Sequence, residues 1–285
     1  MKSAASVSVH RFSKQGIREE NDWLAVEEPL EIRLDFGPTG LRQQKSISIT
    51  MRTPGDDREL ATGFLFTEGI IQNIQQIQDI THLPAYSPEE TDNIILVKLD
   101  ESATVDLNRL ERNFYTSSSC GVCGKASIAA VKTCSNVQLP VGRPTFAEAL
   151  IHQLPHQLRQ QQALFEHTGG LHAAALFDPE GQLLLLREDV GRHNAVDKLI
   201  GAALFEGWVP LQNQLILVSG RASFELVQKA LMAGIPLLAA VGAPSSLAVQ
   251  LAKDSGMSVL GFVRNDRFNI YSGAERIVAT RPITK

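Results

Sequence analysis

Three short apolar runs in the second half of the chain constrain its fold more than any other feature. They cover residues 215–219, 236–241 and 258–263, and sequence with a helical pattern separates each run from the next. Short strands that are almost wholly apolar are typical of a parallel sheet buried on both faces, because its crossover helices cover it. The second half of the chain is therefore predicted to be an α/β region with parallel strands.

A hairpin and a helix are expected before these strands. Residues 171–177 and 182–187 flank Asp-Pro-Glu-Gly, a sequence typical of a tight turn. Residues 194–205 have the apolar spacing of a buried helix. Two glycines precede the hairpin, and we expect the C-terminal region to begin there and to cover residues 169–285.

The first half predicts a smaller mixed α+β region, residues 26–168, behind a poorly ordered lead-in, residues 1–25. Apolar and polar residues alternate at 45–51, which is the period-two pattern of a half-buried strand. Pro155 lies in a helical stretch, and we expect it to begin a second helix rather than to lie inside one. The expected elements are strands at 30–36, 45–51 and 93–99, a helix from Asp56 to Gly69 in which Glu59 completes a capping box, a short helix at 126–131, and helical sequence at 145–162.

Composition excludes several classes of protein. The chain has 285 residues, 44% of them hydrophobic, and a formal net charge of −4 with a pI near 6.0. A nucleic-acid-binding domain is normally strongly basic, so binding to nucleic acid is not expected. No apolar run reaches the roughly 18 residues of a membrane span, and residues 1–21 do not resemble a signal peptide. We therefore expect a cytoplasmic protein that contacts neither nucleic acid nor membrane.

Two of the three cysteines, Cys120 and Cys123, lie within one four-residue stretch of a Ser- and Gly-rich segment, residues 116–125. Such a segment buries little surface, which suits chemistry that must reach another protein's active site. A Cys-x-x-Cys pair in a reducing compartment indicates a reactive thiol or a metal. Four interpretations stay open: a sulfur carrier, half of a zinc site, a thioredoxin-like redox pair, and inert structural thiols. The zinc interpretation lacks ligands, because Cys134 is the only other cysteine.

Polar turns follow each of the three parallel strands. Ligands of open parallel sheets bind at the carboxyl ends of the strands, and helix N-termini there present N–H groups to anions. We therefore expect a phosphate-bearing ligand, with ordinary helix capping as the alternative; no Gly-x-Gly-x-x-Gly or Walker loop is present. His172 is a weaker candidate, because a lone histidine in an apolar strand is more often a hydrogen-bonded core residue than a ligand. The candidate phosphate contacts are Ser219, Arg221, Ser245 and Arg267.

A charged segment, residues 188–198, joins the hairpin to the next helix. One interpretation is a pocket wall in which Arg192 and His193 meet a phosphate or a heterocycle. The other is a charged turn whose Asp197 and Lys198 are solvated on a helix face. The residues alone favour neither interpretation.

Five stretches form an ordered set of motifs. They are Thr-Gly-Phe-Leu-Phe-Thr-Glu-Gly at 62–69, Ser-Cys-Gly-Val-Cys-Gly at 119–124, Thr-Gly-Gly-Leu-His-Ala-Ala at 168–174, Glu-Asp-Val-Gly-Arg-His-Asn-Ala-Val-Asp-Lys at 188–198 and Ser-Gly-Arg-Ala-Ser-Phe-Glu at 219–225. Together they resemble the FdhD family. The resemblance covers nearly the whole chain from about residue 25, and the set is far more specific than any one of its members.

The resemblance implies a sulfur carrier protein that formate dehydrogenase needs for its activity. A cysteine desulfurase would load sulfur onto the Cys-x-x-Cys loop, and the sulfur would pass to the molybdenum of the bis-molybdopterin guanine dinucleotide cofactor. By resemblance Cys120 carries the persulfide and Cys123 fills the second position, which makes the chain a sulfurtransferase. The implied partners are the desulfurase, the dehydrogenase and the molybdenum cofactor or a guanine nucleotide, without a permanent metal; a homodimer is left open.

The family's cofactor-binding segment follows the last parallel strand. The family can carry a Lys-Pro-Gly-Arg-like run there, whereas this chain has Arg-Asn-Asp-Arg, so Asp266 adds a negative charge close to a phosphate. The segment maps onto Phe262, Val263, Arg264, Asn265, Asp266 and Arg267.

The resemblance also implies a fold similar to that of cytidine deaminases, with a three-layer C-terminal region. Deamination is not expected, because zinc deaminases use His-x-Glu and Pro-Cys-x-x-Cys sequences. This chain has His-Ala-Ala at 172–174 and no proline before Cys120. The alternative to a sulfur carrier is a chaperone that binds the cofactor and docks on formate dehydrogenase, with structural or zinc-bound cysteines.

Overall fold

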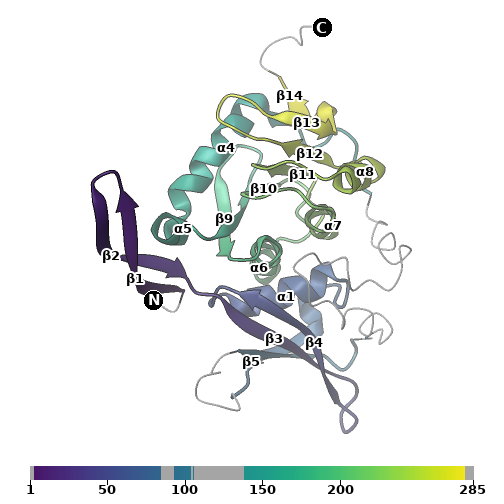
Figure 1. Ribbon diagram of the computed structural model, residues 1–285. Coiled ribbons are helices and arrows are strands. Elements are labelled where there is room, and N and C mark those ends of the chain that lie inside the picture. Colours follow the sequence, from purple (N-terminus) through teal and green to yellow (C-terminus); the bar gives the residue numbers. More distant parts are fainter. Residues whose placement is uncertain (1–2, 85–92, 104, 106–137, 280–285) are drawn as a thin grey trace.

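The computed structural model describes residues 3–84, 93–103, 105 and 138–279. Its largest sheet has six strands in the order β13-β12-β11-β10-β8-β9 (Figure 1). The three central apolar runs pair in parallel, as predicted, and the hairpin β8-β9 joins them through an antiparallel pairing of β8 with β10. The strands are β8 (His172–Phe177), β9 (Leu183–Asp189), β10 (Leu215–Val218), β11 (Leu237–Ala240), β12 (Ser258–Gly261) and β13 (Asn269–Ser272).

Helices cover both faces of this sheet, as Figure 1 shows. The side chains of β10 alternate between two apolar clusters, because successive residues of a strand point to opposite faces. Leu215 and Leu217 pack in the cluster that contains α4, and Ile216 and Val218 pack in the cluster that contains α6, α7 and α8. The helices are α4 (Glu148–Gln161), α5 (Ala163–Thr168), α6 (Arg192–Phe205), α7 (Phe224–Met232) and α8 (Ser246–Asp254).

The N-terminal part of the chain forms a second sheet with the strand order β4-β3-β6-β5. Helix α1 lies beside this sheet (Figure 1). Strands were predicted at 30–36, 45–51 and 93–99, and all three are confirmed; β5 was not predicted. The elements are β3 (Glu28–Phe36), β4 (Gln43–Arg52), α1 (Asp57–Thr67), η1 (Ile74–Gln76), β5 (Ile77–His82) and β6 (Ile94–Leu99). A separate two-stranded parallel sheet pairs β7 (Phe146–Ala147) with β14 (Ile277–Val278), and η4 (Ala274–Arg276) directly precedes β14.

Two glycines let α1 and α6 approach each other closely. A methyl group on Gly63 would overlap the backbone carbonyl of Asp197, and one on Gly201 would overlap the backbone carbonyl of Glu59. Both glycines therefore exclude any side chain. This crossing joins the helix of the N-terminal sheet to the first helix of the C-terminal sheet.

The structure corrects the prediction for the lead-in. Residues 4–25 form an antiparallel hairpin of β1 (Ala4–Ser13) and β2 (Gly16–Ala25), with ten paired residues on each strand (Figure 1). The turn needs Gly16, whose φ is 117°. The hairpin was missed because its strands are mostly exposed, so that the alternation of a buried strand is absent from the sequence.

The predictions at Pro155 and Asp56 are also wrong. Helix α4 runs through Pro155, because apolar residues at 150, 151, 154 and 158 keep one buried face in register on both sides of it. Asp56 has a left-handed backbone with φ 57° and makes no capping bond. Its carboxylate lies 3.9 Å from Arg187 Nε instead.

The mixed α/β class is confirmed, and the cytidine-deaminase-like arrangement stays a prediction. The division of the chain at residue 169 also stays a prediction. Helix α4, which precedes residue 169, packs on the sheet formed by the residues that follow it.

Candidate functional site

The candidate site is the sheet edge where β9, β10, β11 and β12 end and β8 begins. Strand β8 runs against β10, so its first residue lies beside the end of β10. Backbone hydrogen bonds connect the turns along this edge: Ser219 N–H donates to Ala173 O at 2.9 Å, and Gly242 N–H donates to Gly220 O at 2.9 Å. The structure thus brings segments from five strands together. Their role as ligand contacts stays a prediction.

Two predicted phosphate contacts have structural partners at this edge. The hydroxyl oxygen of Ser219 accepts the Ala173 N–H at 2.9 Å. The hydroxyl oxygen of Ser245 accepts the Ala248 N–H at 3.2 Å and so caps α8. Ser245 therefore has the role that ordinary capping predicts, whereas Ser219 bonds to strand β8; each hydroxyl keeps its own proton to donate.

The segment after β12 divides into core and surface residues. Val263 is fully buried, so its side chain packs in the core. Phe262 is 42% exposed and has a left-handed backbone with φ 53°, a strained conformation for a non-glycine residue. The Arg264 guanidinium donates to the carbonyls of Val241 and Val263 at 2.7 and 2.8 Å. This arginine therefore ties the turn to the sheet. The exposed residues of the segment are Phe262, Arg264, Asn265, Asp266 and Arg267.

Three basic side chains gather where β8 begins and α6 begins. His172 is the first residue of β8, and Arg192 and His193 open α6. Gly220 lies between them: a Cβ atom there would lie 3.4 Å from His172 Nδ1 and 3.6 Å from Arg192 Cδ. We name these four residues the basic corner. Within the described parts of the chain, the buried Nε of Arg192 has no hydrogen-bond partner.

His172 is half-buried at the start of β8. Burial lowers its pKa, and the positive charges of Arg192 and His193 lower it further, against the opposing effect of Asp189. The imidazole is therefore neutral at pH 7 while the corner is free of an anion.

His193 is held by α7. Its Nε2 lies 3.1 Å from Glu225 Oε2 and 3.2 Å from Ser223 Oγ, and Ser223 donates to the same carboxylate oxygen at 3.1 Å. Burial acts to raise the pKa of Glu225, but the hydrogen bond and charge of His193 outweigh it and leave that pKa lowered. Sequence reasoning gave Ser223 and Glu225 no role, although both lie in the motif at 219–225.

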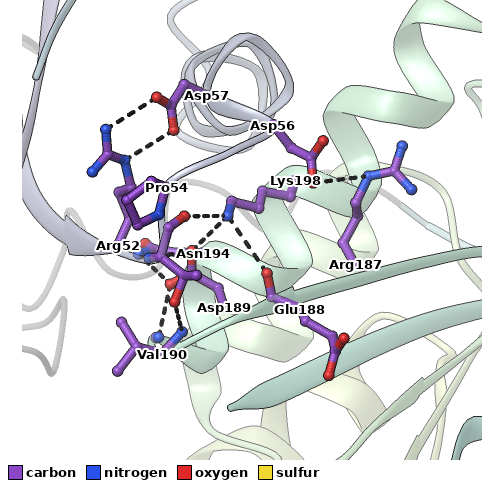
Figure 2. A network of polar contacts seen from close by, with 12 residues as sticks. Arg52, Pro54, Asp56, Asp57, Arg187, Glu188, Asp189, Val190, Asn194 and Lys198 are labelled. Atoms are coloured by element: carbon purple, nitrogen blue, oxygen red, sulfur yellow. Dashed lines mark hydrogen bonds and ion pairs between the residues drawn. The ribbon is translucent and has the colours of Figure 1, made fainter. Parts of the chain in front are cut away.

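The charged segment 188–198 is structural at its far end. Asp197 and Lys198 are 2% and 1% exposed, so the interpretation that both are solvated is wrong. Figure 2 shows the Lys198 amine directed toward Asp189. Lys198 Nζ lies 2.8 Å from Asp189 Oδ2 and donates to the carbonyl oxygen of Thr53 at 2.9 Å. These contacts bind the middle of α6 and the end of β9 to the turn that precedes α1.

Asp197 of α6 contacts residues of both α1 and α7. Both of its carboxylate oxygens lie 2.9 Å from Lys229 Nζ, and Oδ1 accepts the Thr67 hydroxyl at 2.8 Å. Lys229 also lies 3.3 Å from Glu68. Helices α1, α6 and α7 thus share one buried ion-pair network, which the sequence did not reveal because its members are up to 162 residues apart.

The two cysteines of the predicted loop, Cys120 and Cys123, lie outside the described residues. So do the rest of the segment 116–125, the helix expected at 126–131, and Cys134. Among the residues that are described, no group of three or more His, Cys, Asp or Glu could hold a metal ion. None of the described helices is long and apolar enough to cross a membrane.

Comparison with known proteins identifies the family. Residues 25–278 match the FdhD/NarQ family. A sulfur carrier protein FdhD from Streptomyces avermitilis is 49% identical over 272 residues, which cover 94% of each chain. A sulfur carrier protein FdhD from Saccharolobus solfataricus is 40% identical and covers 95% of this chain and 99% of its own.

A solved structure is also similar to this chain over most of its length. The crystal structure of a candidate formate dehydrogenase accessory protein from Desulfotalea psychrophila has a TM-score of 0.71 and 26% identity, and covers 96% of this chain and 99% of its own. The chain belongs to the FdhD/NarQ family. The resemblance found in the sequence motifs is therefore confirmed.

Proposed function

We propose that this protein is a sulfur carrier that acts in the maturation of formate dehydrogenase. The observation that carries the proposal is the match over 94% of the chain to a relative named sulfur carrier protein FdhD. The Cys-x-x-Cys pair supplies the thiols that such a role requires. A cytoplasmic location fits a pair of thiols that must stay reduced between turnovers.

The chemistry proposed for the pair is persulfide transfer. The thiolate of Cys120 attacks the outer sulfur of a persulfide on a cysteine desulfurase. A sulfur–sulfur bond to Cys120 forms, and the desulfurase cysteine leaves as a thiolate. The protein is then a sulfurtransferase whose loaded form is the Cys120 persulfide. Cys123 assists the later release of sulfur by thiol exchange, which leaves a disulfide for a cellular thiol to reduce.

The acceptor in this proposal is the molybdenum of the bis-molybdopterin guanine dinucleotide cofactor, which is cargo rather than a resident group. The strand-end edge supplies the features that a guanine dinucleotide needs. Arg192 Nε, which has no partner among the described residues, and Gly220, which has no side chain, suit a phosphate, and the exposed ring of Phe262 offers a flat apolar face to a base. Exposed Arg267 lies in the same segment as Phe262. Formate dehydrogenase would receive the sulfurated cofactor, and a homodimer is compatible with this role.

The competing proposal is a cofactor chaperone whose cysteines are structural or bind zinc. Mass spectrometry after incubation with a cysteine desulfurase and cysteine separates the two. We expect a reducible gain of one sulfur atom on the peptide 116–125, absent in Cys120→Ala and kept in Cys134→Ser. We also expect Cys120→Ala to abolish activation of formate dehydrogenase and Cys134→Ser to retain it. Stoichiometric zinc without the sulfur gain, or full activation by Cys120→Ala, would refute the carrier.

A further inference from the structure

The β1-β2 hairpin has little support from the rest of the described chain. Its two strands pair only with each other among the described strands, and Figure 1 shows its turn standing away from both larger sheets. Val26 N–H donates to Ser3 O at 3.1 Å, and the Ser3 hydroxyl donates to Pro54 O at 2.9 Å, so these hydrogen bonds lie at its base. A two-stranded hairpin alone is at best marginally stable in water. A further surface packed on this hairpin would therefore stabilise it.

One face of the hairpin is open to such a surface. Residues directly opposite each other in a strand pair share a face, and Phe12 lies opposite Ile17 in this way. Strand β2 lies beside α5, and four residues of the other face, at positions 7, 9, 20 and 22, are half-buried. Every residue of the open face between positions 6 and 23 is exposed. We name this set the arm face: Ser6, Ser8, His10, Phe12, Ile17, Glu19, Asn21 and Trp23.

The arm face is apolar at both ends and polar in the middle. Phe12 and Ile17, which are 76% and 58% exposed, lie next to the turn, and Trp23, which is 48% exposed, lies near the base. Hairpin turns are normally flanked by polar residues, and large apolar side chains grouped on a surface are typical of a protein interface. The four residues between the two ends are polar or charged.

This pattern is complementary to itself when it is reversed. If the arm face of a second copy packs on it with the strands antiparallel, the apolar turn end lies over Trp23 of the second copy. The opposite pair His10 and Glu19 then lies over the pair Ser8 and Asn21, so charged groups meet neutral hydrogen-bonding groups rather than like charges. A two-fold axis makes each of these contacts twice. Because each arm joins its body at the base, this arrangement also places the two bodies at opposite ends.

We propose that the arm face is a dimerisation surface, on which a second copy of this chain packs antiparallel with Phe12 and Ile17 of each copy over Trp23 of the other. A second copy fits better than an unrelated protein, because one copy supplies the complement of both the apolar ends and the polar middle. The arm face is about 10 Å wide and about 20 Å long, from strand spacing and rise. It is thus smaller than a standard interface, and the dimer is expected to dissociate in the micromolar range or above.

This inference goes beyond the proposed function and does not depend on it. All of the hairpin except its last residue precedes residues 25–278, which match the family. The association requires neither sulfur nor a nucleotide, so it is measured with the full chain alone in a reducing buffer. Sulfur loading on Cys120 can fail while the dimer forms, and the dimer can fail while loading succeeds.

Sedimentation velocity over a concentration series from micromolar to submillimolar tests the proposal. Wild type should pass from monomer to an elongated dimer. Phe12→Ser and Trp23→Ser should each weaken the dimer by about 10- to 150-fold, the effect of one large apolar side chain losing its burial. Leu24→Ser is the matched control, because Leu24 is 49% exposed and lies on the other face, next to Trp23 in sequence. This control should associate as wild type does.

A mixture of Phe12→Ser with Trp23→Ser tests the antiparallel contact itself. Each variant alone loses the contact of Phe12 with Trp23 at both places in its own dimer. A mixed dimer keeps one of the two contacts, because one copy retains Phe12 and the other retains Trp23. The mixture should therefore associate more tightly than either variant alone. Circular dichroism should show the same fold for all variants, since the replaced side chains are exposed.

Three outcomes would overturn the proposal. Wild type that stays monomeric at every concentration removes the dimer. A dimer that is equally tight in Phe12→Ser, Trp23→Ser and wild type, or that Leu24→Ser weakens as much as Trp23→Ser does, places the interface elsewhere. A mixture that associates no more tightly than its two components rules out the antiparallel contact between Phe12 and Trp23.

Discussion

The buried pair of Asp197 and Lys229 should be one of the costliest places to remove a single charge. The two residues are 2% and 5% exposed, and both carboxylate oxygens lie 2.9 Å from Lys229 Nζ. Lys229→Met leaves the Asp197 carboxylate buried without its cation and with the Thr67 hydroxyl as a neutral donor. Breaking a buried pair in this way typically costs about 3–5 kcal/mol. We expect a loss of that size in the free energy of unfolding.

Urea unfolding followed by far-UV circular dichroism measures this loss. Arg11→Ala is the matched control, because it breaks the Arg11–Glu20 pair, whose side chains are 61% and 36% exposed, and should cost below about 1 kcal/mol. The double variant Asp197→Leu with Lys229→Met should recover most of the loss, since an apolar pair leaves no buried charge. The reasoning is refuted if Lys229→Met costs no more than Arg11→Ala.

Two further predictions concern the crossing of α1 with α6 and the N-terminal sheet. Gly201→Ala should destabilise the protein by more than about 1–3 kcal/mol, the usual range for overpacking, because its methyl group overlaps the backbone of Glu59. Gly170→Ala should be nearly neutral, because its methyl group would make only ordinary contacts, 3.7 Å from Ala25 Cβ and 3.8 Å from the Thr168 carbonyl oxygen. Equal midpoints in urea for the two variants would contradict this. The hydrogen bond from Arg33 lowers the pKa of Glu31. The pair therefore stabilises the fold fully at pH values above 4.5, the ordinary pKa of a glutamate, and this stabilisation is lost as the pH falls through the lowered pKa. The stability difference between wild type and Glu31→Gln should therefore be below about 1 kcal/mol at pH 7 and shrink on acidification, and a difference that grows would contradict the pairing.

The central strands were predictable because each consists of consecutive apolar residues. A strand covered on both faces needs apolar side chains at every position, and residues 215–218 and 237–240 meet that need without reference to distant parts of the chain. The β1-β2 hairpin has no such apolar pattern in its sequence, because most of its side chains are exposed. Its ladder of backbone hydrogen bonds depends on no particular residue type outside the turn at Gly16.

The candidate site was predictable in position more than in detail. The rule that ligands bind at the carboxyl ends of parallel strands led to the sheet edge at which the polar turns meet. Whether a ligand binds there stays a prediction. Residue type alone could not show that the Arg264 guanidinium bonds to carbonyls of its own turn while Arg192 Nε has no partner in the described chain. It also could not show that Lys198 is buried, because its partner Thr53 lies 145 residues away.

The position of the basic corner depends on the N-terminal part of the chain. Asn194, in the first turn of α6, donates to the carbonyl of Met51 at 2.8 Å, and the Thr53 hydroxyl accepts the Val190 N–H at 3.1 Å. These bonds fix the turn that carries Arg192, and Lys198 anchors the same turn through its ion pair with Asp189 (Figure 2). The polar core of the turn thus holds the residues of the basic corner in place. The motif at 188–198 therefore combines two tasks: its inward residues hold the helix, and its first two helical residues face the strand-end edge.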